Sequence, residues 1–226
     1  MKIIIDIQGL QREGNRKRGI GRYITELTKK IIYYFPYNEY ILFTNSSLPD
    51  ISSDFINEIN DKSLNISYFK CPTIGDIDDR YLGRYSNYWI SIKLRSYAIA
   101  LFNADIMLIT SFFDGFKDNS LINYDKSFKL PPIVSILYDL IPLINSNQYL
   151  NNDPEYKLFY LNRVNDLSDL DGLLTISESS KDEAINFLQI NTDYIFNISS
   201  ACDENKYSAL DSNTEEDIEI LGKFLL

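Results

Sequence analysis

Short apolar runs recur along the chain, and each is bounded by polar, glycine or proline residues. Seven of them have the length of a strand: 2–7, 39–44, 65–69, 105–110, 132–137, 172–176 and 194–198. Several are apolar throughout instead of alternating with polar residues. That pattern is typical of strands buried on both faces of a parallel sheet.

Helical patterns lie between the strands, where apolar residues recur at spacings of three and four. The predicted apolar faces are Ile20, Tyr23, Ile24, Leu27 and Ile31; Leu82, Tyr85, Trp89, Ile92 and Ile99; Tyr156, Phe159, Tyr160, Val164 and Leu167; and Ala184, Ile185 and Leu188. We expect the last helix to begin in SESSKDE, where Ser180 and Glu183 have capping-box spacing. Strands that alternate with helices predict a doubly wound α/β domain with a mostly parallel, Rossmann-like sheet.

Two stretches carry neither pattern and are predicted to be loops, 45–53 and 111–132. The second is longer than is usual in a compact domain, which favours a functional role. Its side chains Phe112, Phe113 and Phe116 are candidates for an exposed partner-binding surface; the alternative is that they cover the domain's own core. We expect one domain over 1–207, followed by a polar linker and a short helix at 208–226.

The composition narrows the classes of function. The net charge of -10 argues against a broad nucleic-acid-binding surface. Histidine is absent, which excludes histidine metal sites, Ser–His triads and histidine general bases. Two cysteines, Cys71 and Cys202, are too few for a disulfide framework. The apolar runs are shorter than a membrane-spanning helix, and Asp6 and Gln8 interrupt the first one, so we expect a cytoplasmic protein.

The first candidate site is the stretch NRKRGIGRY, which follows the first strand and leads into the first helix. In open parallel sheets, ligands bind at the carboxyl ends of the strands. Gly19 and Gly21 would let a ligand approach the backbone, and Arg22 would reach a phosphate. The helix N-terminus favours an anion or a hydroxyl-rich ligand; the alternative is a solvated basic loop. A dinucleotide fingerprint is excluded because Ile24 stands where a third glycine belongs, and the P-loop pattern is absent.

Two further strand ends carry polar side chains. SILYDLIPL delivers Tyr138 and Asp139 at the end of one predicted strand, and LLTISESS places Ser177 and Glu178 at the end of the next. For Asp139 the alternative to a site is a cap on the following turn. For the serine and glutamate it is a plain helix cap. We expect both strand ends to line one cleft with the glycine-rich stretch at 19–22.

Four segments in this order, IDIQGLQ…RGIGRY, YDLIPL, TISESSKDEAI and NISSACDENKY, resemble the N-terminal half of family-4 retaining glycosyltransferases. The most similar members are bacterial mannosyltransferase-like enzymes of O-antigen and capsule synthesis, and the resemblance covers residues 1–207. It implies the first domain of a GT-B fold, in which two Rossmann-like domains face a cleft. In that family the first domain mainly receives the acceptor, and the second binds the nucleotide sugar. The resemblance also implies that Gly19 and Gly21 face the cleft and that YDLIPL lines the sugar site.

The chain departs from that family in three places. Tyr138 stands where the family's HDLIPL pattern has a histidine that is thought to contact the donor sugar. The segment at 200–203 reads SACD, without the glycine of the family's hinge segment. We also expect the second, donor-binding domain of that family to be missing from this chain. We therefore expect the chain alone to have no measurable sugar-transfer activity.

Three functions stay open. The first is the acceptor-binding part of a glycosyltransferase that builds a surface polysaccharide. Its partners would be a glycan or lipid-linked acceptor, a nucleotide-sugar donor and a donor-domain chain, with peripheral association at the inner face of the membrane. The second is a catalytically inactive module that binds a glycan or a partner transferase, and the third is an unrelated phosphate-binding α/β protein. No metal, cofactor or nucleic acid is expected.

Overall fold

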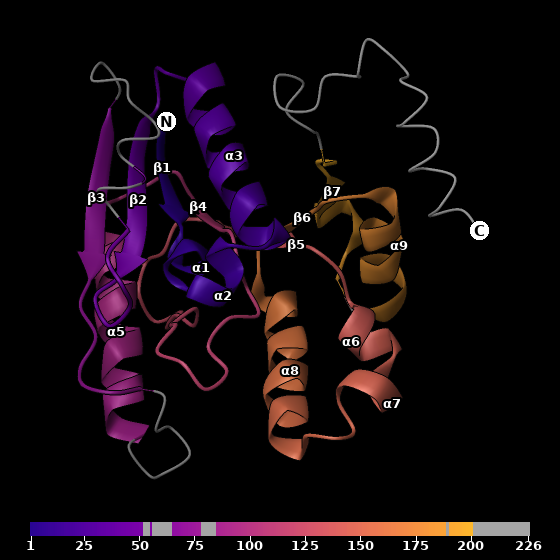
Figure 1. Ribbon diagram of the computed structural model, residues 1–226. Helices are drawn as coiled ribbons and strands as arrows, with labels where there is room; N and C mark the ends of the chain where they lie inside the picture. The colour runs from indigo at the N-terminus through magenta and orange to yellow at the C-terminus, as the bar shows by residue number, and fades with distance from the viewer. Residues whose placement is uncertain (52–54, 56–64, 78–84, 189, 201–226) are drawn as a thin grey trace, which may run out of the picture.

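The computed structural model describes residues 1–51, 55, 65–77, 85–188 and 190–200 (Figure 1). The predicted linker and helix at 208–226 lie outside these residues. Within them, seven strands form one sheet in the order β3-β2-β1-β4-β5-β6-β7, and every neighbouring pair is parallel. The strands are β1 (Lys2–Asp6), β2 (Glu39–Asn45), β3 (Ile66–Cys71), β4 (Ile106–Ile109), β5 (Ile133–Leu137), β6 (Gly172–Thr175) and β7 (Ile195–Asn197). The predicted doubly wound, Rossmann-like α/β fold is confirmed.

Helices follow the strands, as the alternating pattern predicted. The longer ones are α3 (Gly19–Tyr34), α5 (Tyr85–Leu101), α8 (Pro154–Asp166) and α9 (Glu178–Phe187). The shorter ones are α1 (Gln8–Gln11), α2 (Glu13–Arg16), α6 (Ile141–Ile144), α7 (Ser146–Tyr149) and the 3₁₀ turns η2 (Leu167–Asp169) and η3 (Thr192–Tyr194). Residues 8–16, between the first predicted strand and the first predicted helix, form the two single-turn helices α1 and α2. The stretch 111–132 contains neither helix nor strand, as predicted.

The continuous apolar strands are explained by helices on both faces of the sheet. Ile4 of β1 belongs to a buried cluster that includes Ile99 of α5. Its neighbour Ile5 points to the opposite face and belongs to the cluster that includes Ile24 of α3. Because successive strand residues point to opposite faces, a strand covered on both sides requires apolar residues at every position.

Two local predictions about the helices are wrong. Trp89 was placed on the buried face of α5, yet it is 57% exposed, whereas Ile92 on the same predicted face is buried. The capping box was placed at Ser180 and Glu183, but the N-cap of α9 is Ser177, whose Oγ accepts from the backbone N–H of Ser180 at 3.1 Å. Three serines within four residues, at 177, 179 and 180, make the cap position ambiguous in the sequence.

Candidate functional site

The order of the strands changes direction between β1 and β4, and open sheets of this kind bind ligands outside the carboxyl ends at that point. Figure 1 shows α1, α2 and α8 grouped beyond the arrowheads of the strands. Asp6 ends β1 there, and Thr110 follows β4. The Thr110 hydroxyl donates to the backbone carbonyl of Asp6 at 2.6 Å. The Asp6 carboxylate pairs with Arg95 of α5 at 2.6 Å, and both side chains are 1% exposed.

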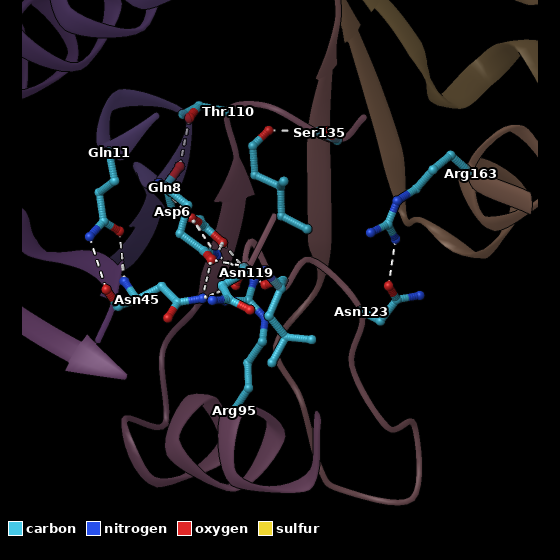
Figure 2. Close-up of polar contacts among 12 residues, drawn as sticks. Asp6, Gln8, Gln11, Asn45, Arg95, Thr110, Asn119, Asn123, Ser135 and Arg163 are labelled. Carbon is cyan, nitrogen blue, oxygen red and sulfur yellow. Dashed lines mark hydrogen bonds and ion pairs between the residues drawn. The ribbon is translucent and has the colours of Figure 1, made fainter. Parts of the chain in front are cut away.

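A buried polar network surrounds the side chain of Asp6 (Figure 2). Gln8 donates through Nε2 to the Asp6 carboxylate at 2.8 Å and to the carbonyl of Leu121 at 3.0 Å. Its Oε1 accepts from Asn45 at 3.0 Å and from the backbone N–H of Leu121 at 3.1 Å. Gln11 exchanges two further hydrogen bonds with the backbone of Asn45. The network fastens the 111–132 stretch to the ends of β1 and β2, so any ligand must bind outside it.

The glycine-rich stretch lies at this same edge, but its two glycines differ. A Cβ atom at Gly21 would lie 2.4 Å from the carbonyl oxygen of Asn15 and 2.6 Å from Cα of Arg16. Gly21 therefore allows α2 to pack against the first turn of α3, and the space is filled by the chain's own backbone. A Cβ at Gly19 would meet nothing within 4 Å. Arg22 is exposed on the outer side of α3.

A buried carboxylate that the sequence analysis did not single out organises the edge. Asp114, in the 111–132 stretch, is 3% exposed and accepts hydrogen bonds at Oδ1 from Arg12 and Asn15. Arg12 also pairs with Asp118 at 2.8 Å. The backbone carbonyl of Asp114 accepts from Arg163 of α8 at 3.1 Å. Asp114 thus ties together the segment before the glycine-rich helix, the long loop and α8.

Burial is the main cause of the shifted pKa values of Asp114 and Tyr138. Loss of solvent raises the pKa of Asp114, and this effect exceeds the opposing one of the neighbouring Arg12 guanidinium. Burial likewise raises the pKa of Tyr138 far above its ordinary value, with small further contributions from Tyr23 and Asp114. Tyr138 therefore keeps its proton at physiological pH and acts at this edge as a hydroxyl donor.

Three hydrogen bonds fix the turn after β5 to the end of β4 and to α9. The hydroxyl of Tyr138 donates to the carbonyl of Thr110 at 3.0 Å. The carbonyl of Tyr138 accepts from the Ser180 hydroxyl of α9 at 2.6 Å. The backbone N–H of Leu140 donates to the carboxylate of Glu183, also on α9, at 2.7 Å. The residues that the sequence suggested as a capping box instead fasten α9 to the YDLIPL turn.

The structure brings the three predicted segments together at one edge. The rings of Tyr23, one residue after Arg22, and Tyr138 pack edge to face with centroids 5.7 Å apart. Ser180 links the same turn to the first turn of α9, where Ser177 and Glu178 lie. The 19–22 stretch, the YDLIPL turn and the start of α9 therefore lie near one another, and a common cleft lined by their predicted residues stays a prediction.

The polar groups proposed for the site also make local contacts. Asp139 accepts from the backbone N–H of Ile141 at 3.1 Å, which is the turn cap considered as an alternative. Ser177 is the helix cap of α9. Glu178 accepts from the side-chain amide of Asn197 at 2.6 Å. These contacts orient the groups, and a role for them in binding stays a prediction.

The prediction of an exposed phenylalanine surface is wrong, and the alternative holds. Phe112 is 3% exposed and belongs to the core. Phe113 stacks on Tyr160 with ring centroids 4.8 Å apart, and Phe116 packs against Phe159 at 5.4 Å. The long loop therefore uses its aromatic residues to cover α8.

Within the described ranges, no group of three or more cysteine, aspartate or glutamate side chains is arranged to hold a metal ion. In the same residues, the helices are too short or too polar for any of them to cross a bilayer.

Fold and geometry together define a Rossmann-like α/β domain whose candidate site lies at the carboxyl edge of its sheet. No protein-family model matches the chain. Over 231 aligned residues the chain is 29% identical to part of the serotype-specific mannosyltransferase WbdA of Escherichia coli, of which it covers 27%. Another WbdA from Escherichia coli is 33% identical over 58% of the chain, which covers 16% of that relative. The chain thus spans about a quarter, or less, of the length of the curated relatives it matches.

Two solved structures align with nearly the whole chain. A glycosyltransferase from Rickettsia africae aligns with 99% of this chain and 49% of its own, at 14% identity and a TM-score of 0.44. UGT89C1 of Arabidopsis thaliana, complexed with UDP, aligns with 97% of this chain and 54% of its own, at 7% identity and a TM-score of 0.49. The sequence relatives confirm the resemblance to bacterial mannosyltransferases, whereas membership of family 4 stays a prediction.

Proposed function

We propose that the chain forms the acceptor-binding part of a glycosyltransferase that elongates a surface polysaccharide. In this proposal a glycan or lipid-linked acceptor binds at the carboxyl edge of the sheet. The sugar comes from a nucleotide-sugar donor held mainly by a further domain or a partner chain. The similarity to mannosyltransferases supports mannose as the transferred sugar.

One observation carries the proposal. Three segments that are distant in the sequence meet at the edge where such sheets bind ligands, through the Tyr23–Tyr138 ring contact and the Ser180–Tyr138 hydrogen bond. They present both exposed cationic and carboxylate side chains, Arg22 and Glu178 among them, which suit the hydroxyl groups of a sugar. The YDLIPL turn adds the half-buried carboxylate of Asp139.

The first test is binding of mannose oligosaccharides to the purified chain, measured by calorimetry or by chemical-shift changes. Asp139→Asn keeps an oxygen that can cap Ile141 but removes the charge, so the fold should survive. We expect binding to weaken about tenfold, because a hydrogen bond to a charged group is roughly twice as strong as the neutral one, of about 0.5–1.5 kcal/mol, that the asparagine retains. Asp193→Asn is the matched control, since η3 precedes β7 and lies at the opposite edge of the sheet. Equal affinity of Asp139→Asn and the unchanged chain would refute this site.

The second candidate is a glycan-binding module without transfer activity, and Tyr138 favours it. The resemblance implies a histidine at this position for the donor sugar, whereas the Tyr138 hydroxyl is already committed to Thr110. A transfer assay with nucleotide-linked mannose, an acceptor and a supplied donor domain separates the candidates. Product formation by the unchanged chain supports the enzyme. Acceptor binding without product, including in Tyr138→His, supports the binding module.

A further inference from the structure

The first turn of α8 carries a half-buried tyrosine, Tyr156, and this helix lies on the side of the sheet where the strands end (Figure 1). The ring of Tyr156 packs against Phe116 of the 111–132 stretch with centroids 5.0 Å apart, and against Tyr160, in the next turn of α8, at 6.0 Å. Among the residues that the structure describes, none forms a hydrogen bond with the Tyr156 hydroxyl. The long loop therefore supports the ring, while the phenol group stays available to a ligand.

The YDLIPL turn places a carboxylate near the same helix. Oδ1 of Asp139 accepts from the backbone N–H of Ile141, whereas no described residue donates to Oδ2. Burial raises the pKa of Tyr156, and the negative charge of Asp139 raises it further. The same two effects, in the same order, raise the pKa of Tyr160. Asp139 therefore lies near enough to the tyrosines of α8 for one ligand to contact both the carboxylate and a ring.

A guanidinium group completes this set of side chains. The positive charge of Arg12, located between α1 and α2, opposes the effects of burial and of Asp139 on the pKa of Tyr156. The Arg12 side chain is 31% exposed and is held by ion pairs with Asp114 and Asp118. A guanidinium has more N–H groups than two such contacts use. The fixed side chain can therefore donate to a ligand with little further loss of conformational freedom.

These three groups suit a neutral sugar unit better than an anion. A carboxylate accepts hydrogen bonds from sugar hydroxyls, a guanidinium donates to sugar oxygens, and an aromatic ring packs against the C–H face of a sugar ring. A phosphate would be attracted by Arg12 but repelled by the carboxylates of Asp118 and Asp139. We therefore expect a sugar, and not the phosphate of a nucleotide, to bind beside Tyr156.

The YDLIPL turn has two sets of neighbours. Tyr138 contacts Tyr23 of α3 and Ser180 of α9, whereas the charge of Asp139 acts on the tyrosines of α8. A single sugar unit would contact one of these two sets. A longer glycan that crosses the turn would reach both.

We propose that Arg12, Asp139 and Tyr156 form a second sugar subsite, so that the acceptor is bound as an oligosaccharide and not as a single sugar. One sugar unit contacts these three side chains. Another lies beside the exposed side chains at the start of α3 and of α9. The inference rests on the proposed acceptor-binding function and adds to it the length of glycan that the site recognises.

The test compares the affinity of the purified chain for mannose with its affinity for mannose oligosaccharides of two and three units, measured by calorimetry. We expect the oligosaccharides to bind about tenfold more tightly, because they add an aromatic contact and its polar neighbours. Tyr156→Leu keeps an apolar side chain against Phe116 but removes the ring and the hydroxyl. It should lower the affinity for oligosaccharides about tenfold. Tyr156→Phe keeps the ring and its packing, and it should lose only about threefold, through the hydroxyl.

Tyr194→Leu is the control, since this tyrosine is 53% exposed on η3, at the opposite edge of the sheet. It should bind oligosaccharides like the unchanged chain. Circular dichroism and thermal unfolding show whether each variant is folded, and Tyr156→Phe decides the question if Tyr156→Leu is not. Equal affinities for mannose and its oligosaccharides would overturn the inference. Full affinity for oligosaccharides in the Tyr156 variants, or an equal loss in the control, would also overturn it.

The same measurements separate this inference from the proposed function. If the unchanged chain binds no mannose sugar, the proposed function fails and the subsite fails with it. If oligosaccharide binding depends on Asp139 but not on Tyr156, the subsite alone is refuted. If Tyr156→Leu weakens the binding of a nucleoside diphosphate instead of an oligosaccharide, the ring serves the donor and the subsite is again refuted.

Discussion

The hydroxyl of Tyr138 donates to the carbonyl of Thr110 at 3.0 Å, which joins the turn after β5 to the end of β4. The resemblance to glycosyltransferases gives this position to a ligand-binding histidine. Here the side chain stabilises the edge of the sheet from inside. The residue at the position that the resemblance assigns to a donor site is therefore also a structural element, and the two roles can be separated by mutation.

Tyr138→Phe should lower the free energy of unfolding by about 0.5–1.5 kcal/mol, the net contribution of one intramolecular hydrogen bond. The aromatic packing against Tyr23 is kept, because the ring remains. Chemical denaturation at neutral pH measures the change. Tyr37→Phe is the control, since Tyr37 is 95% exposed and should give no difference. Equal stability of Tyr138→Phe and the unchanged chain would show that the hydroxyl contributes nothing to the fold.

Gly21→Val should destabilise the protein by about 1–3 kcal/mol, the usual cost of overpacking a closely packed site. The new Cβ would lie 2.4 Å from the Asn15 carbonyl, so α2 must move away from α3. Gly19→Ala is the matched control at the start of the same helix. Its Cβ meets nothing within 4 Å, so its effect should be neutral or stabilising by up to about 1 kcal/mol.

Thermal and chemical unfolding of these two glycine variants would give the comparison. Equal effects of Gly21→Val and Gly19→Ala would contradict the packing role. Loss of ligand affinity in Gly21→Val would not by itself show that Gly21 touches a ligand, because the same change displaces Asn15, which donates to Asp114.

The stability difference between the protein and Asp114→Asn should depend on pH. Burial raises the folded-state pKa of Asp114 above its unfolded value, so its contribution is fully present below the unfolded pKa of about 4 and is lost as the pH rises through the folded pKa. The free energy of unfolding of the unchanged protein, relative to that of Asp114→Asn, should therefore be highest at acid pH. This difference should fall as the pH increases.

Glu13→Gln is a control of opposite sign. The hydrogen bond and charge of Lys17 lower the pKa of the exposed Glu13, so its small contribution appears as the pH rises above the unfolded pKa. Denaturant titrations of the three proteins between pH 3 and 7 measure both trends, about the unfolded carboxyl pKa of about 4. If the free energies of unfolding of Asp114→Asn and the unchanged protein differ by the same amount across this range, the raised pKa of Asp114 is contradicted.

Arg95→Met should lower the free energy of unfolding by about 3–5 kcal/mol, because it leaves the buried carboxylate of Asp6 without its cation. The methionine keeps much of the packing against Phe43, whose ring lies 5.0 Å from the guanidinium carbon. Lys70→Met is the matched control, since the Lys70–Asp50 pair at 3.3 Å is exposed to solvent and should contribute about 0–1 kcal/mol. If the two variants lose similar amounts of unfolding free energy, the buried pair stabilises the fold no more than the exposed pair does.

The apolar pattern determined the fold class because it reports burial on each face of an element. Every predicted strand exists, and the apolar run at 2–7 forms β1 between α3 and α5 because helices cover both faces of the sheet. The parallel arrangement followed from the same fact. Local chemistry was predicted less reliably, since Ser177, Ser179 and Ser180 are all possible caps for α9, and the first of them is used.

Tertiary structure alone decided how the edge of the sheet is built. Gly21 is a glycine because the backbone of Asn15 passes against it, and no sequence pattern gives that distance. Nothing in the sequence around Asp114 singles it out, yet Arg12 and Asn15, about a hundred positions away, donate hydrogen bonds to its carboxylate. Phe112 belongs to the core, although nothing in its loop distinguishes a covering residue from an exposed one. Periodicity records which face of an element is buried, whereas contacts between distant loops depend on where the sheet places their ends.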